Sequence, residues 1–369
     1  MIKRQIIIWL TIAILIGVAL IITSAPREET IKIGAILPLS GDAAFMGQNS
    51  QRGIELAVEE INAEGGVDGK NIEIIYEDDQ AITHNSINSF NKLKYSDGVS
   101  VIVGPSWTQN VLALAPLMER LKEKILLITP TASGADITRA GDYIFRTWPS
   151  DAVQDDFIAN KIYALGYHNI AVFYVNNDWG LGHKHAFYQA FLEQGGKVKE
   201  EYSVDFNAKD FHTQIIKAKE LKIDAIFELL NIKQEVLFAQ QCKELGLDVQ
   251  IFASSGFEDA GNLELGGNEV EGIIYSYPAG GSDAFIAKFE EKYGTTPGLG
   301  VANAYDAIRV IANAMNKVGT SPENIKNYLY TVRDYQGASG NFSFDENGDL
   351  EKEWMLKTVE NGRFIPYDE

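Results

Sequence analysis

Apolar segments alternate with amphipathic segments along the chain from residue 31 onward. Four short apolar segments predict buried strands: 31–37, 71–78, 99–104 and 124–129. The first is followed by a predicted helix over 50–66, in which Ile54, Ala57, Val58 and Ile61 fall on one face and a Gly-Gly pair marks the end. Strands joined in this way by helices predict a parallel, doubly wound α/β sheet.

The same alternation restarts after residue 150 and predicts a second block. Further strands and helices are expected there, the strands at 169–175, 197–204, 224–230 and 249–255 and the helices near 209–221 and 233–246. Two consecutive α/β blocks of comparable size predict two similar lobes, although no sequence repeat relates them.

The last part of the chain has a different pattern. Two helical patterns, at 282–293 and 299–318, precede strands of a terminal hairpin with Asn347-Gly348 at its turn. The chain is therefore expected to cross between the lobes more than twice. Our division assigns 31–147 plus about 278–333 to lobe 1 and 148–277 plus about 334–369 to lobe 2, with a ligand cleft between them.

The N-terminal segment, residues 1–26, predicts export. Lys3 and Arg4 precede an uncharged run that extends to Ser24 and is rich in Ile, Leu, Ala and Val. The run fits either a cleaved signal peptide or an uncleaved membrane anchor, and both place the rest of the chain outside the cytoplasm. No cysteine directly follows the run, which argues against a lipoprotein anchor.

Charge and cysteine content narrow the function classes. The formal net charge of -19 disfavours nucleic acid and anionic lipid as partners. The single cysteine, Cys242, excludes an intramolecular disulfide framework and lies on the apolar side of a predicted helix, where it is expected to fill the core.

Two strand-to-helix turns carry hydroxyl groups. "GPSWT" places Ser106 and Thr108 after the third strand, and "TPTAS" places Thr131 and Ser133 after the fourth. These hydroxyls can cap the helices that follow, or they can receive an anion at the positive end of a helix. Because parallel strands end at one sheet edge, both turns are expected to converge where open α/β sheets bind ligands.

Other motifs argue against catalysis and metal binding. "GAILPLSG" matches neither a phosphate loop nor a dinucleotide fingerprint, and no nucleophile elbow occurs. His183 and His185 are two positions apart on a predicted helix and point away from each other, so a solvated face is expected. "DENGD" resembles the start of a calcium loop, but Leu350 and Leu356 stand where Gly and Glu are required.

Several segments in order carry a family resemblance. "IKIGAILPLSGDAAFMGQ", "VGPSWTQ", "LLITPTAS", "FRTWPSDAVQ", "IAVFYVNNDWGLG" and "NFSFDENGDL" resemble the branched-chain amino acid binding family, the extracytoplasmic solute-binding proteins of ATP-driven importers. The resemblance covers roughly 31–366 and implies the type I fold, two doubly wound lobes joined by a three-strand hinge. It also implies a monomeric receptor with an importer permease as partner, no cofactor, no metal and no catalysis.

The resemblance also implies a ligand site. In the family, the two turns hold the ligand carboxylate, and here they supply Ser106, Trp107, Thr108, Thr131, Ala132 and Ser133. The lid tyrosine of the family is replaced by Trp179, which keeps the aromatic ring and loses the hydroxyl. Other expected contacts are Phe45 and Met46 in the first loop, Asn231, and Glu258 as the acid that pairs with a ligand ammonium, with Asp259 as its alternative.

Three hypotheses for function follow. The first is a receptor that closes its two lobes around a small carboxylate, foremost a branched-chain, aromatic or aliphatic amino acid. If no acid reaches the cleft, an aromatic or aliphatic carboxylate or a small amide is the alternative ligand. The second is an anchored sensor domain of the same fold, which an uncleaved N-terminal helix would favour. The third is an enzyme in the interlobe cleft, which would turn its ligand over instead of releasing it unchanged.

Overall fold

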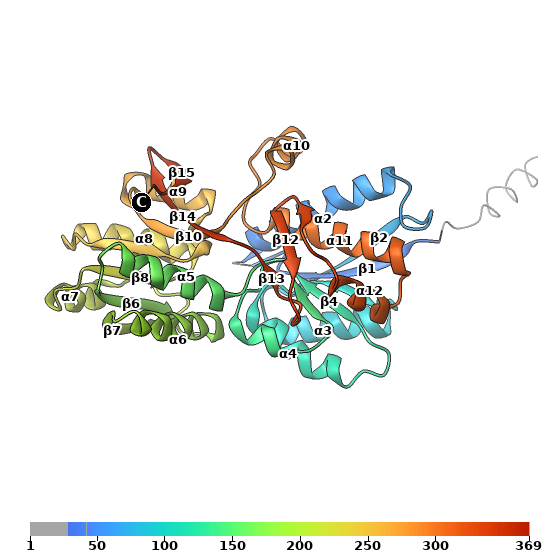
Figure 1. Cartoon of the computed structure of the whole chain (residues 1–369), viewed down its shortest axis with the longest axis horizontal. Coiled ribbons are helices and arrows are strands. Elements are labelled where there is room, and N and C mark those ends of the chain that lie inside the picture. The colour runs from blue at the N-terminus through green and yellow to red at the C-terminus, as the bar shows by residue number, and fades with distance from the viewer. Residues whose placement is uncertain (1–28, 42, 369) are drawn as a thin grey trace, which may run out of the picture.

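The computed structural model describes residues 29–41 and 43–368, which form two α/β lobes lying side by side (Figure 1). The expected signal peptide or anchor at 1–26 lies outside the described residues. Within the described ranges, no helix is both long and apolar enough to cross a bilayer.

The first sheet has five parallel strands in the order β2-β1-β3-β4-β5. They are β1 (Ile31–Leu37), β2 (Ile72–Asp78), β3 (Val101–Val103), β4 (Leu126–Thr129) and β5 (Ile144–Arg146). The four predicted strands are confirmed. The fifth, β5, was not predicted because it has only three residues and ends in the charged Arg146.

Helices cover both faces of this sheet. They are α2 (Ala44–Ala63), α3 (Thr83–Tyr95), α4 (Thr108–Glu119), the short 3-10 helix η1 (Ala135–Arg139), α10 (Asp283–Tyr293), α11 (Val301–Val318) and α12 (Pro322–Leu329). One buried cluster joins the sheet to α2, α10, α11 and α12, and another joins its opposite face to α3 and α4. Helix α2 begins earlier than the predicted 50–66 and includes Gly47, where a Cβ would lie 2.1 Å from the Pro38 carbonyl oxygen, so a glycine allows the close approach of helix and strand end.

The second sheet has seven strands in the order β15-β14-β10-β9-β8-β6-β7. They are β6 (Asn169–Val175), β7 (Lys197–Val204), β8 (Ala225–Leu229), β9 (Gln250–Ala253), β10 (Ile274–Pro278), β14 (Trp354–Glu360) and β15 (Arg363–Pro366). Strands β6 to β10 pair in parallel, whereas β14 and β15 form an antiparallel hairpin at the edge.

Helices also cover the second sheet. They are α5 (Asp151–Ala164), α6 (Asp178–Glu193), α7 (His212–Glu220), α8 (Ile232–Glu244), α9 (Ala260–Gly266) and the 3-10 helices η2 (Ser255–Phe257) and η3 (Gly267–Val270). One face packs on α5 and α6, and the other on α7 and α8. Cys242 is buried in the α7/α8 cluster, which confirms the prediction that it fills the core.

A small third sheet contains β11 (Tyr335–Gly337), β12 (Gly340–Phe344) and β13 (Leu350–Glu351). The predicted hairpin turn at Asn347-Gly348 joins the antiparallel strands β12 and β13. Our division placed this segment in lobe 2, but Phe342 and Phe344 belong to the first core. Phe344 packs edge-on against Phe145 of β5 with ring centroids 5.5 Å apart, so burial of these aromatics holds the segment in lobe 1.

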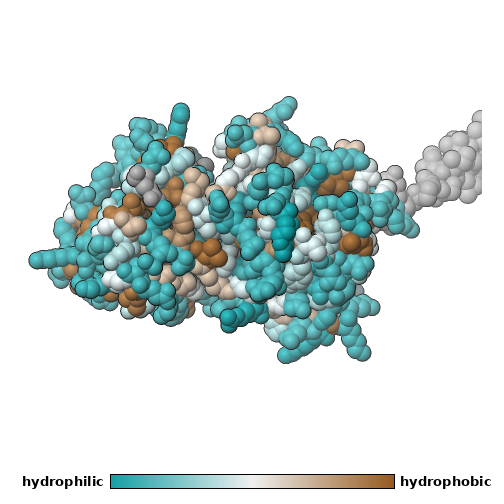
Figure 2. Space-filling model, in the orientation of Figure 1, coloured by the Kyte–Doolittle hydropathy of each residue, from teal (hydrophilic) through white to brown (hydrophobic). Residues whose placement is uncertain are grey.

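The chain passes between the two large sheets three times: from β5 to α5, from β10 to α10 and from β13 to β14. The first and third crossings touch through a parallel bridge between Pro149 and Leu350. The crossings lie between the two lobes, in the middle of Figure 1. Figure 2 shows a largely hydrophilic surface whose outline is indented between the lobes.

Candidate ligand site

The two lobes meet through residues that follow the carboxyl ends of their strands. Trp107, just after β3, packs edge-on against Phe206, just after β7, with ring centroids 6.2 Å apart and planes at 80°. Ligands of open α/β sheets bind at this edge. The strand-end turns of lobe 1 that contain Trp107 therefore face the strand-end loops of lobe 2, and these are the two walls of the candidate site.

The polar side chains of the turn before α4 do not cap the helix. Trp107 occupies the N-cap position and no side chain caps the helix, so the predicted capping by Ser106 or Thr108 is wrong. The Ser106 hydroxyl and the Trp107 indole nitrogen are buried and have no hydrogen-bond partner among the described residues. Buried donors without an acceptor are costly, and a bound anion would satisfy them.

The second turn is bonded directly to the first. The Thr131 hydroxyl donates to the Ser106 carbonyl at 3.1 Å, and the Gly134 amide donates to the Thr108 hydroxyl oxygen at 3.1 Å. Because the oxygen of Thr108 accepts this bond, its own O–H remains able to donate. The predicted convergence of the two turns is thus observed. Ala132 packs in the core, and its amide is engaged within the turn, where it donates to the Thr129 hydroxyl oxygen at 3.1 Å.

Arg146 binds the backbone carbonyl groups of the second turn. Its guanidinium donates to the carbonyl oxygens of Ser133 and Gly134 at 2.8 and 3.0 Å. The short helix η1 that follows has Gly134 at its N-cap and no side-chain cap. Ser133 therefore does not cap this helix, although capping was one of the two expected roles of its hydroxyl.

Phe45 and Met46 lie half-buried in the first turn of α2, beside the end of β1. One turn further along, Ser50 is fully buried and its hydroxyl has no partner in the described ranges. A side chain at Gly300 would contact both Ser50 and the Thr131 methyl, so Ser50 adjoins the second turn. The sequence did not single out Ser50, although a serine on the buried face of α2 was visible in its pattern.

On the opposite wall, Trp179 is the second residue of α6, half-buried, with its ring centroid 4.7 Å from that of His183. Asn231 is the N-cap of α8 and forms a capping box with Gln234. Its amide also donates to the Phe206 carbonyl at 2.9 Å. Asn231 therefore shapes the wall by fixing α8 and the loop that carries Phe206.

The two acids expected to receive a ligand ammonium are already engaged. Glu258 accepts a hydrogen bond from the Tyr275 hydroxyl at 2.7 Å and forms an ion pair with Lys357. Asp259 caps α9 by accepting from the Gly261 amide at 2.8 Å. Each of these carboxylates has a structural partner within its own lobe.

Glu235 of α8 is the acid that sequence reasoning missed. It is 1% exposed, one of its oxygens accepts from Asn262 at 2.7 Å, and the other has no partner among the described residues. A side chain at Gly256 would lie 3.9 Å from this free oxygen and 3.5 Å from the hydroxyl of Ser254, which is also unpaired. Burial raises the pKa of Glu235, and the nearby Glu228 raises it further. The sequence does contain a signal for Glu235: it is an acidic residue on the apolar stripe of α8, and the same stripe contains Phe238 and Cys242.

His183 also departs from expectation. The predicted solvated face is wrong for this residue, which is 1% exposed, although His185 is exposed. Burial follows from two aspartates of α5 that bond its ring nitrogens. No cluster able to hold a metal ion occurs among the described residues.

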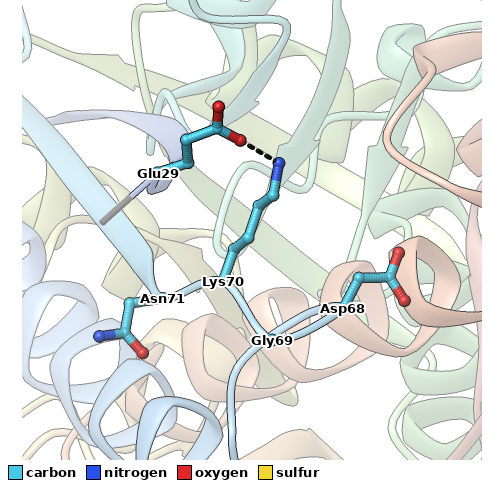
Figure 3. Close-up of a pocket in the computed structure, with 5 residues that line it drawn as sticks. All are labelled: Glu29, Asp68, Gly69, Lys70 and Asn71. Atoms are coloured by element: carbon cyan, nitrogen blue, oxygen red, sulfur yellow. Dashed lines mark hydrogen bonds and ion pairs between the residues drawn. The ribbon is translucent and has the colours of Figure 1, made fainter. Parts of the chain in front are cut away.

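A cavity of about 350 Å³ opens on the surface of the first lobe, at the turn that precedes β2 (Figure 3). In it Lys70 is paired with Glu29 at 2.5 Å, and Asp68 and Asn71 point away from this pair. Residues before a strand lie at the amino edge of a parallel sheet, opposite the edge that bears the two turns. This cavity is therefore separate from the candidate site.

Two α/β lobes, three crossings and a polar site between facing strand ends define a two-lobed solute-binding protein. The chain belongs to the periplasmic binding protein family, whose sequence pattern matches residues 30–363. This family contains extracytoplasmic binding proteins rather than enzymes, and the resemblance to its branched-chain amino acid binding members is confirmed.

Three relatives illustrate the range of ligands. A leucine-, isoleucine-, valine-, threonine- and alanine-binding protein of Pseudomonas aeruginosa is 29% identical over 331 residues, 87% of each chain. The leucine binding protein LivK of Thermotoga maritima superposes with a TM-score of 0.85 at 28% identity, covering 92% of this chain and 98% of that one. A solute binding protein of an ABC transporter from Rhodopseudomonas palustris, in complex with 3,4-dihydroxybenzoic acid, gives a TM-score of 0.82 at 27% identity, covering 91% and 95%.

Proposed function

We propose that this protein is the solute receptor of an ABC importer and binds a small carboxylate ligand, an amino acid, by closing its two lobes. The observation that carries the proposal is the pair of interlocked turns. Ser106, Trp107 and Thr108 each present a donor that no described residue accepts, at the edge of lobe 1 that faces lobe 2. Donors grouped in this way suit a carboxylate.

The second lobe supplies the complementary groups. Phe206 provides aromatic surface against Trp107 of the first turn, and Trp179 adds a second aromatic ring at the start of α6. Glu235 with Ser254 provides a buried acceptor for a ligand amino group. An ammonium group would allow Glu235 to ionise despite its burial, because an opposite charge favours the charged form. A ligand without an amino group would leave that oxygen unpaired, so Glu235 favours amino acids over benzoates.

Lobe closure follows from this division of contacts. A ligand that touches the lobe 1 turns and the lobe 2 acid gains both sets of interactions only when the lobes are together, and it therefore shifts the population toward the closed form. Importer permeases would then distinguish closed from open receptors, which makes a permease the proposed partner.

The test is a thermal-shift screen followed by calorimetry, with twenty amino acids and a set of benzoates on the protein lacking residues 1–28. Stabilisation by one or more amino acids in preference to benzoates supports the proposal, because a ligand stabilises the state that binds it. Conversion of a bound compound into a product, or no stabilisation by any carboxylate, would contradict it.

A further inference from the structure

His183 lies at the centre of a buried cluster of charged side chains between α5 and α6. Its Nε2 is 3.0 Å from an oxygen of Asp151, and its Nδ1 is 2.8 Å from an oxygen of Asp155. All three side chains are at most 2% exposed. A neutral imidazole has only one N–H, so it can donate to one carboxylate, whereas an imidazolium donates to both.

The charges around His183 favour the imidazolium. Burial by itself lowers the pKa of His183, but Asp151 and Asp155 outweigh it and raise that pKa to about 10. Burial raises the pKa of Asp155 to about 7, against the opposing effect of His183. These two aspartates are the charged groups that act on His183 in the described structure.

The cluster connects the two walls of the candidate site. On one side, the backbone amide of Asp151 donates to the Ser133 carbonyl at 2.9 Å, the same oxygen that Arg146 holds. On the other, the ring of His183 lies 4.7 Å from that of Trp179, with the planes at 74°. Trp179 precedes His183 by one helical turn, so both point to the same face of α6.

We infer that His183 is a positioning residue: as an imidazolium held between Asp151 and Asp155, it fixes Trp179 at a set distance from the Ser133 turn. The two rings meet edge to face, a preferred geometry for aromatic pairs, so a fixed His183 ring gives the ring of Trp179 a defined position. The hydrogen bonds to Asp151 fix the start of α5, and through its amide they fix α5 against the turn. The effect on ligand binding rests on the proposed function, whereas the protonation of His183 and the placement of Trp179 do not.

The ligand-independent test is the fluorescence of Trp179, obtained as the difference between the protein and its Trp179→Phe variant. A protonated imidazole in contact with indole quenches its emission, so the emission of Trp179 is expected to stay low between pH 6 and 8 and to rise near pH 10. His183→Gln should remove the quenching at all pH values, and His185→Gln, on the exposed face of the same helix, should change nothing. A rise in emission near the ordinary histidine value, or equal emission in His183→Gln, would overturn the inference.

Asp151→Asn provides a second variant if His183→Gln does not fold. It keeps the backbone bond to Ser133 and removes one of the two negative charges, so the pH at which Trp179 brightens should fall toward neutrality. An unchanged midpoint would contradict the arrangement.

Binding completes the test with L-leucine as probe. His183→Gln should weaken L-leucine binding by about tenfold, the loss expected for roughly one hydrogen-bonded contact, whereas His185→Gln should leave it unchanged. If the wild-type protein binds neither L-leucine nor another amino acid, the proposed function fails, while the fluorescence titration still decides the role of His183. Full affinity in a folded His183→Gln protein would remove that role from ligand binding.

Discussion

Arg146 and Asp349 are separated by more than two hundred residues in sequence and form a buried ion pair through two parallel contacts. The guanidinium Nε and Nη2 each lie 2.6 Å from a different oxygen of Asp349. Arg146 ends β5, just before the first crossing, and Asp349 precedes β13, just before the third. The same guanidinium holds the carbonyls of Ser133 and Gly134, so this pair joins two crossings to the candidate ligand turn.

Asp349→Asn should therefore destabilise the protein strongly. Removing one partner of a buried ion pair leaves an uncompensated charge, and we expect the free energy of unfolding to fall by about 3 kcal/mol. Urea denaturation at neutral pH measures this. Glu346→Gln, at an exposed position of the same turn, is the matched control and should stay within about 0.5 kcal/mol of wild type.

Glu228 should make stability fall as pH rises. Burial raises the pKa of Glu228 to about 8 from an ordinary value of 4.5, so the folded state binds more protons than the unfolded state between these values. The stability that this group contributes is complete below about pH 4.5 and is lost as pH increases through about 8.

Glu228→Gln removes this effect, since its amide needs no proton to stay neutral. At pH 8 the variant should be more stable than wild type by about 1–3 kcal/mol, and at pH 5 the two should be similar. Denaturant unfolding at both pH values is the measurement, with exposed Glu264→Gln as control. Equal pH dependence in Glu228→Gln and wild type would show that Glu228 is ionised in the folded protein.

Thr108→Ala should weaken binding of an amino acid carboxylate. The loss of a hydrogen bond to a charged group is worth about 1.5–3 kcal/mol, and Thr108→Ser, which keeps the hydroxyl, should retain most of the affinity. Calorimetric titration with L-leucine compares the three proteins. Similar losses in both variants would assign the effect to the methyl group, which contacts the Gly134 backbone.

Glu235→Gln should reduce the preference for an amino group. We expect wild type to bind L-leucine more tightly than 4-methylpentanoate, the same carboxylate without the amino group. The variant should lose about 2 kcal/mol or more of L-leucine affinity and little of the other. Competition calorimetry measures both, and Glu264→Gln again serves as control. A loss shared equally by the two ligands would place Glu235 outside the amino-group subsite.

Much of the fold was predictable because buried apolar positions recur along the sequence with the period of the helix or strand that contains them. The strand 169–175, apolar after Asn169, has the predicted bounds of β6, and the apolar stripe of α11 identified a helix that packs on α2. By contrast, the three residues of β5 are too short to show a period, and the aromatic residues of β12 could join either lobe until their partner Phe145 was known.

The candidate site was partly predictable for a similar reason. Consecutive parallel strands end at one edge, so the turns at Ser106 and Thr131 could be expected together, and the bond between them shows that they meet. Glu235 and His183 could not be found in this way. Their roles depend on Ser254, Asp151 and Asp155, which are distant in sequence, and an isolated acid or histidine on a helix usually faces solvent.

A double-mutant cycle between Thr108 and the ligand carboxylate tests whether the interlocked turns receive that carboxylate. Affinities of wild type and Thr108→Ala are measured by calorimetry for the amino acid found in the screen and for its amide, which lacks the carboxylate charge. Wild type is expected to prefer the acid by at least about tenfold, and Thr108→Ala is expected to lose most of this preference. An equal preference in both proteins, or tighter binding of the amide, would contradict carboxylate binding by the turns.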